Sequence, residues 1–138
     1  MPTSDYEDKV VEDLYDMIDE ELDKGKGNDY RILLGDWNAV VGNCRKEDVV
    51  GKWGLGKKNH RGDMLVQFCK RRKLVITNTL FEHHPRRPYT WKAPGDTARY
   101  QIDYIIVSQR YKNSVKTSAA SYPGADCNSD HKLVMMTA

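Results

Sequence analysis

The sequence predicts an α+β domain in which two amphipathic helices accompany several short strands. Apolar residues recur at helical spacing near the N-terminus and again over residues 61–72. Between and after these stretches, short apolar runs alternate with turns rich in Gly, Pro and Asp. The chain has 138 residues, of which 39% are hydrophobic and 30% are charged. We therefore expect residues 1–138 to form a single folded unit.

The first predicted helix ends near Asp23. Ser4 and Glu7 have the spacing of a capping box, in which the two side chains satisfy the opening amide groups. Gly25 and Gly27 follow the helix and end it. Its apolar face is formed by Val10, Val11, Leu14, Met17, Ile18 and Leu22. We interpret the acidic side chains on its other faces as solvated, and expect this helix to repel DNA.

The remaining elements are shorter. A second helix over residues 61–72 places Met64, Leu65, Phe68 and Cys69 inward, which makes Cys69 a small core residue. Residues 40–59 are glycine-rich and charged, as in a long surface loop. Apolar strands are expected at residues 31–34, 74–79, 101–107 and 133–136, with a strand beginning at 89–91 and an edge strand at 115–119.

Charge is distributed unevenly along the chain. Residues 1–23 carry ten acidic side chains and one lysine, whereas the remaining residues carry 21 basic and ten acidic side chains. The net charge is nevertheless only +2. A basic body is compatible with a polyanionic partner, and equally with a basic solvated surface.

Cysteine usage and hydropathy indicate the compartment. Cys44, Cys69 and Cys127 are too few and too scattered for a disulfide framework or a zinc knuckle. No apolar run approaches the roughly 18 residues of a membrane helix, and no signal peptide opens the sequence. We therefore expect an intracellular protein that does not contact a membrane.

Asp36 and Asn38 stand just after the apolar residues 32–34. Residues i and i+2 of an extended segment point the same way, so a carboxylate and an amide would be aimed at one spot beyond a strand end. Such a pair suits a metal-bound phosphate. The alternative is a strand followed by an ordinary Asx turn.

Asp103 interrupts an otherwise apolar strand, and Asp130 and His131 precede the last strand. A buried carboxylate needs a partner, and a histidine held by an aspartate has a fixed tautomer and raised basicity. We therefore pair Asp103 with His131. Alternatively, Asp103 faces solvent on an edge strand.

The order of these motifs makes the pattern more specific. Gly-Asp-Trp-Asn, Thr-Trp, Ile-Asp-Tyr-Ile and Ser-Asp-His occur in this order, each at a predicted strand end. The set resembles the exonuclease–endonuclease–phosphatase superfamily, the DNase I-like fold. The stretches at 35–42, 74–79 and 123–126 are similar in particular to endonuclease domains of non-LTR retrotransposons and a domesticated relative of these. The resemblance extends over essentially the whole chain.

The resemblance implies a catalytic role for each matching residue. Asp36 would position or activate the attacking water, and Asn38 would hold the scissile phosphate, supported by Thr90. His131 would act as general base or electrophilic stabiliser, oriented by Asp103. The reaction would be hydrolysis of a DNA phosphodiester.

The resemblance also implies a metal and a DNA-binding hairpin. Asp130, with Asp36, would hold Mg²⁺ or Mn²⁺. Residues 91–99 would form the hairpin that enters the DNA groove. Gln101 departs from the family pattern, which often has Arg there, so one phosphate contact is in doubt. The DNA-binding side chains would be Arg86, Arg87, Trp91, Lys92 and Arg99.

The family domain is about twice as long as this chain, which resembles its C-terminal half. The fold class implied is one half of a four-layer α/β-sandwich, with a mostly antiparallel sheet and helices on one face. The other half supplies an Asn, a metal-binding Glu and a Tyr, so the metal should bind weakly. The sheet face that the other half would cover is left open, and we expect self-association through it.

Three functions are compatible with these observations. The first is a magnesium-dependent DNA endonuclease of nuclear location, and the second is a catalytically inactive nucleic-acid-binding or interaction module derived from one. The third is a phosphatase of the same superfamily. The basic hairpin and retrotransposon-like motifs make the third the least favoured.

Overall fold

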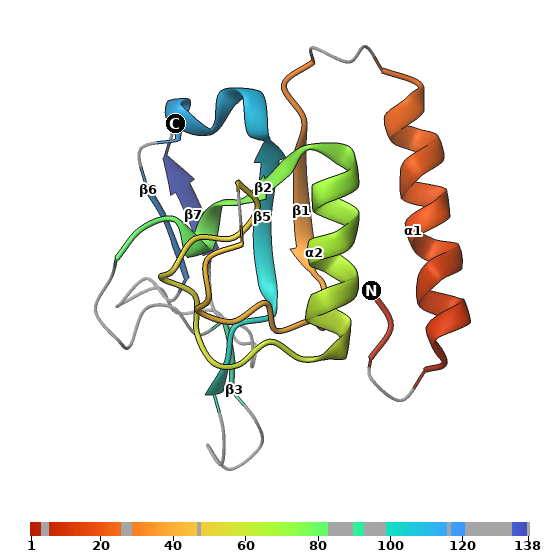
Figure 1. The fold of residues 1–138 in the computed structure, drawn as a ribbon, viewed down its shortest axis with the longest axis horizontal. Helices are drawn as coiled ribbons and strands as arrows, with labels where there is room; N and C mark the ends of the chain where they lie inside the picture. Colours follow the sequence, from red (N-terminus) through yellow and green to blue (C-terminus); the bar gives the residue numbers. More distant parts are fainter. Residues whose placement is uncertain are drawn as a thin grey trace.

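The computed structural model describes residues 1–3, 6–25, 29–46, 48–82, 90–92, 99–115, 117–120 and 134–137. They form α-helices, 3₁₀ helices and small antiparallel sheets (Figure 1). The predicted α+β class is confirmed.

The main sheet has the order β1-β5-β2. Its strands are β1 (Ile32–Asp36), β2 (Leu74–Ile76) and β5 (Asp103–Ser108), and both pairings are antiparallel. β5 is central and buried over most of its length, because it has a neighbour on each side. The register joins Asp36 to Asp103 at one end of the sheet and Leu74 to Ser108 at the other.

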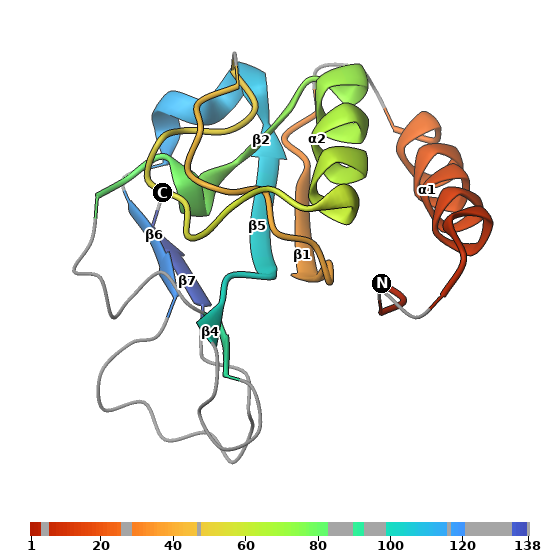
Figure 2. The same ribbon diagram turned by 60° about the horizontal axis from the view of Figure 1, so that its bottom comes forward.

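α2 (His60–Arg72) lies over one face of this sheet, and α1 (Asp8–Asp23) stands to the side, beyond β1 and α2, with its buried residues in the same core (Figures 1 and 2). Tyr15 of α1 packs against Phe68 of α2 with ring centroids 4.8 Å apart, and against Trp37 at 6.3 Å. The sheet contributes alternate residues to this core, as its pleat requires: Leu33, Leu74, Ile76, Tyr104 and Ile106.

The opposite face of the sheet has a smaller apolar cluster. Val75, Ile105, Val107 and Val115 are buried there. On β1, however, Ile32 and Leu34 remain 48% and 68% exposed. These side chains share a face with Val107 and Ile105, their register partners on β5. The edge of this face is therefore apolar and accessible.

Ion pairs join the two helices. We had expected the acidic residues of α1 to be only solvated, and for Asp19 and Asp23 this expectation is wrong. Asp19 accepts from Arg71 at 2.8 Å and from Arg72 at 2.6 Å. Arg72 also bonds Asp23 at 2.8 Å, which raises the pKa of Arg72 and lowers that of Asp23. α1 thereby neutralises part of the positive charge of α2.

Several predicted bounds are wrong by a few residues. α1 has Glu7 at its N-cap with no side-chain hydrogen bond there, so the predicted capping box is wrong; Ser4 itself lies outside the described residues. β1 extends to Asp36. The stretch predicted as one strand to Thr79 is β2 followed by the 3₁₀ helix η1 (Thr77–Thr79).

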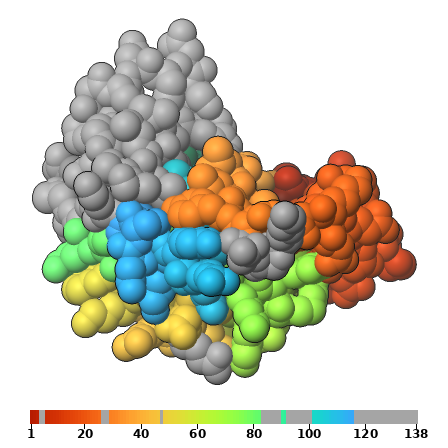
Figure 3. Space-filling model, turned by 90° about the horizontal axis from the view of Figure 1, so that it is seen from above, coloured from red at the N-terminus to blue at the C-terminus, as the bar shows by residue number. Residues whose placement is uncertain are grey.

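The rest of the described chain forms small elements. β3 (Trp91–Lys92) pairs with β4 (Arg99–Tyr100), and β6 (Thr117–Ala120) pairs with β7 (Val134–Thr137). The 3₁₀ helix η3 (Gln109–Ser114) follows β5. Figure 3 views the end of the molecule where η3 lies, with α1 projecting to one side. In the described part of the chain, no helix has the length and apolar character required to span a membrane.

Candidate functional site

Two carboxylates meet at one end of the main sheet. Asp36 ends β1 and Asp103 begins β5, and the two residues are direct partners in the antiparallel register. Side chains of partners project from the same face of a sheet, with Cβ atoms about 4.5–5.5 Å apart. By alternation this face is the one that carries Leu34 and Ile105, away from the helices. Both aspartates are partly exposed.

Buried polar side chains hold Asp103 in place. Thr90 is fully buried, and its Oγ1 accepts from the backbone N–H of Ile102 at 2.9 Å and of Asp103 at 3.0 Å. Asn78 is also buried. Its Oδ1 accepts from the Ile105 N–H at 2.9 Å, and its Nδ2 donates to the Asp103 carbonyl at 3.4 Å.

Sequence reasoning missed Asn78 as a positioning residue. It lies two residues after the apolar strand Leu74–Ile76, and a buried carboxamide there needs both donors and acceptors nearby. The Thr90 Oγ1 accepts the bonds that start β5, and its expected support of a phosphate stays a prediction. Both residues thereby set the position of Asp103.

Asn38 does not extend β1, so the predicted parallel aim of Asp36 and Asn38 is wrong. Asn38 has φ of 46°, in the left-handed region. The Asp36 Oδ1 accepts from the Asn38 backbone N–H at 2.9 Å, which is the Asx turn that was the alternative interpretation. The Trp37 N–H donates to the Ile102 carbonyl at 2.8 Å and ties this turn to the start of β5.

The first residue lies against the same turn. The Asn38 Nδ2 donates to the Met1 carbonyl, and the Met1 ammonium group donates to the Asp36 carbonyl at 3.2 Å. The carboxamide that was expected to hold a phosphate is therefore engaged with backbone.

Gln101 has a structural role here. It is 1% exposed, and its Oε1 accepts from the Leu55 N–H at 3.2 Å. The neighbouring Tyr104 hydroxyl donates to the Gln101 carbonyl at 2.7 Å and accepts from the Val41 N–H at 3.2 Å. Burial raises the pKa of Tyr104, so its phenol stays protonated and can keep both bonds.

Other predicted site residues are only partly placed. Trp91 and Lys92 form β3 and Arg99 belongs to β4, so the predicted hairpin pairs as expected, with Lys92 opposite Arg99. The side chains of Lys92 and Arg99 lie outside what is described, as do Arg86 and Arg87, and the metal and base candidates Asp130 and His131.

The described donors suit a hard divalent cation in kind but form only part of a site. Asp36 and Asp103 offer carboxylate oxygens, which Mg²⁺ and Mn²⁺ prefer. Within the described ranges, no group of three or more His, Cys, Asp or Glu side chains is arranged to hold a metal. A complete coordination shell would need ligands from beyond these two residues.

Comparison with known proteins identifies a relative. Craniofacial development protein 2 from Bos taurus is 45% identical over 134 residues, which is 97% of this chain. The protein of the same name from Tragulus javanicus is 44% identical over 134 residues. The chain spans only 22% and 23% of the length of these relatives. No family model and no solved structure matches the chain. Over nearly its whole length, the chain is therefore homologous to a segment of craniofacial development protein 2.

Proposed function

We propose that this chain is the C-terminal half of a DNase I-like endonuclease domain that hydrolyses DNA phosphodiesters with Mg²⁺ or Mn²⁺. One observation carries the proposal: the register places Asp36 opposite Asp103 on one face at the sheet end. This register brings Asp36, a candidate metal ligand, next to Asp103, the carboxylate that would orient His131. A cation bound by Asp36 would offset the repulsion between these like charges.

The chemistry follows from the donor set. A divalent metal lowers the pKa of bound water and stabilises charge on a phosphoryl oxygen. Asp36 and Asp130 would hold it. Asp103, fixed by Asn78 and Thr90, would orient His131, which would take or give the proton of the reacting oxygen. The ordered motifs, shared with retrotransposon endonucleases, support these roles.

The test is nicking of supercoiled plasmid in Mg²⁺ or Mn²⁺, with EDTA as blank. We expect cleavage to fall at least about a hundredfold in Asp103→Asn and His131→Ala. Asp13→Asn is the matched control, because Asp13 is exposed and pairs only with Lys9 at 2.6 Å in the described structure. Equal activity in all variants would contradict the assignment and indicate a contaminating nuclease.

A specific observation favours an inactive binding module as the second candidate. The Asn38 amide donates to the Met1 carbonyl, and the Asp36 carboxylate caps the Asn38 N–H. Both groups are thus already engaged. DNA binding that weakens steeply with salt, without cleavage in either metal, would favour this candidate. The Trp91–Tyr100 hairpin, with Lys92, Arg99 and the preceding Arg86 and Arg87, would then supply the DNA contacts.

We also propose that the chain self-associates through the exposed β1 edge of the sheet face opposite the helices, where the other half of a four-layer sandwich would pack. The exposed Ile32 and Leu34 support this, since accessible apolar surface favours association. Light scattering should show dimers in wild type and monomers in Leu34→Gln. Monomers of wild type at high micromolar concentration would contradict it.

A further inference from the structure

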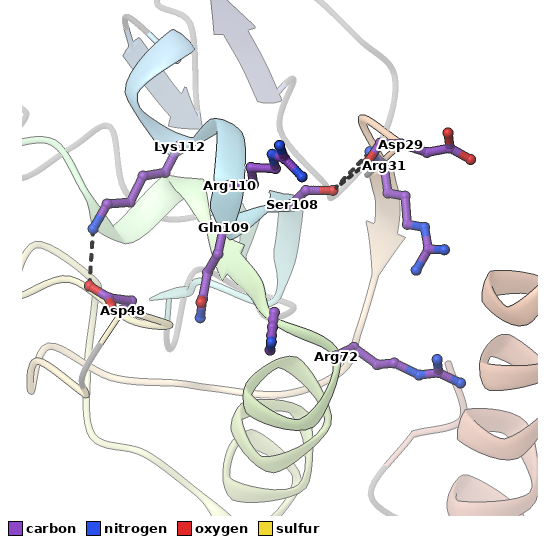
Figure 4. A pocket seen from close by; sticks show the side chains of 9 residues that line it. Asp29, Arg31, Asp48, Arg72, Ser108, Gln109, Arg110 and Lys112 are labelled. Carbon is purple, nitrogen blue, oxygen red and sulfur yellow. Dashed lines mark hydrogen bonds and ion pairs between the residues drawn. The ribbon is translucent and has the colours of Figure 1, made fainter. Parts of the chain in front are cut away.

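Three hollows lie in a row on the surface, starting at the end of the sheet farthest from Asp36 and Asp103. The first, of about 460 Å³, lies between the start of β1, the end of α2, and η3 (Figure 4). The second, of about 250 Å³, shares Asp48 and Lys112 with the first. The third, of about 330 Å³, shares Arg45 and Val50 with the second. The shared lining residues make the row continuous.

Basic side chains dominate the lining, and several have no acidic partner. Lys112 pairs with Asp48 at 3.0 Å, and Lys58 pairs with Asp63 at 3.2 Å. Arg72 is directed to α1 and neutralised there (Figure 4). Among the described residues, the cations along the row that form no ion pair are Arg45, Lys46, Lys52, Lys57, Lys73 and Arg110. We call these six residues, together with Trp53, the basic track.

Among the described residues that line the three hollows, Trp53 is the one tryptophan. It lines the middle hollow and is 36% exposed. The Lys52 ammonium lies 5.0 Å from its ring centroid. Its backbone is anchored, because the Trp53 N–H donates to the Thr79 carbonyl at 3.0 Å and the Gly51 N–H to the Thr79 Oγ1 at 2.8 Å. A partly exposed aromatic ring on an anchored backbone, beside cations, is the arrangement that stacks a base and contacts its phosphate.

We propose that the basic track binds a single-stranded nucleic acid, with cations at the phosphates and Trp53 stacked on a base. A duplex keeps its bases stacked inside and has none to offer Trp53. β5 has six residues, so it separates the track's first hollow from Asp36 and Asp103 by about 17 Å. The track uses none of the proposed catalytic or hairpin residues, so it does not depend on hydrolysis.

The experiment is fluorescence anisotropy with a labelled oligodeoxythymidine and an oligouridine of about 20 nucleotides, in EDTA to exclude cleavage. The combined variant Lys52→Ala, Lys73→Ala, Arg110→Ala should lose at least about tenfold in affinity and reduce the salt slope by about 2. The matched control is Lys9→Ala, Lys24→Ala, Arg71→Ala, which removes the same charge from residues that are paired with acids and line none of the three hollows. It should change affinity by less than about twofold.

A second variant separates base stacking from charge. Trp53→Leu keeps every cation and should weaken binding at least about fivefold, while binding of polyglutamate should not change. Tighter binding of either oligonucleotide than of a duplex of equal length supports the proposal. Tighter binding of the duplex, equal loss in both triple variants, or polyglutamate binding as tightly as the oligonucleotides would overturn it, as would absence of binding by folded wild type.

Discussion

The two ends of the main sheet are built differently. At the acidic end, Asp103 is held by the buried Thr90 and Asn78, and Asp36 by its register and an Asx turn. At the basic end, Lys73 and Arg110 project from exposed positions without acidic partners in the described structure. Buried hydrogen bonds thus position the aspartates at the acidic end, whereas at the basic end Lys73 and Arg110 add charge that no described acidic residue neutralises. Substitutions should therefore cost stability at the acidic end and binding at the basic end.

The largest expected effect is at Gly62, which fixes the loop that follows the acidic end. A Cβ at Gly62 would lie 1.8 Å from the Val40 carbonyl oxygen, which is backbone and cannot move alone. Gly62→Ala should lower the free energy of unfolding by about 3 kcal/mol or more. Denaturant unfolding measures this, with Gly25→Ala as control because its Cβ meets chiefly the flexible Asp29 side chain. Equal stability of both variants would contradict the close packing.

Next is Asn78, whose two bonds position Asp103 and Ile105. Asn78→Ala leaves a buried N–H and carbonyl without that partner and should cost about 2 kcal/mol. Asn113→Ala, at an exposed site of η3, should change stability by less than about 0.5 kcal/mol. If the two variants unfold alike, the buried bonds do not hold the acidic end.

The effect of metal binding at the acidic end on stability should be smaller than that of Asn78→Ala, and thermal unfolding measures it. Saturating Mn²⁺ should raise the midpoint of wild type by about 3 °C, because a ligand that binds only the folded state stabilises it. Asp36→Asn should abolish this increase. A shift that persists in the variant would place the metal elsewhere.

Substitution of Arg72 tests whether its ion pairs with α1 neutralise its positive charge near the basic end. Its hydrogen bond lowers the pKa of Asp23, so the associated stability is present above about pH 4 and is lost as the pH falls through the lowered value. Arg72→Gln should lower stability at neutral pH and narrow the difference from wild type in acid. Oligonucleotide affinity should be unchanged, since Arg72 is paired with Asp19 and Asp23. A constant difference across pH would contradict the linkage.

The smallest effect on stability is expected from the unpaired cations themselves. Lys73→Ala and Arg110→Ala should each change the free energy of unfolding by less than about 0.5 kcal/mol while weakening oligonucleotide binding. Chemical unfolding and anisotropy on the same preparations would separate the two quantities. A stability loss as large as that of Asn78→Ala would show that the two ends are not built differently.

Local patterns predicted much of the fold. The apolar spacing predicted two helices, and the residues expected inward that are buried are Val11, Leu22, Leu65, Phe68 and Cys69. Val10 and Met17 were also expected inward and are instead 42% and 61% exposed, whereas Tyr15, which was not expected inward, is buried. The bounds of β1 and β2 were less accurate, because strand ends depend on the partner strand. The backbone of Asn38 was also not predictable from the alternation of side chains along a strand. Its left-handed conformation accompanies the hydrogen bond from its N–H to Asp36 and the bond from the Trp37 N–H to Ile102.

The sequence by itself determined the elements, the order of the motifs and the uneven charge, since these depend on residue type and spacing. Only the tertiary structure decided which side chains meet. The antiparallel register set Asp36 opposite Asp103, although 66 residues separate them in the chain. Docking of α1 on α2 neutralised Arg71 and Arg72, whose sequence context does not mark them as paired. Pairing across long sequence separations depends on packing in three dimensions, which no local pattern encodes.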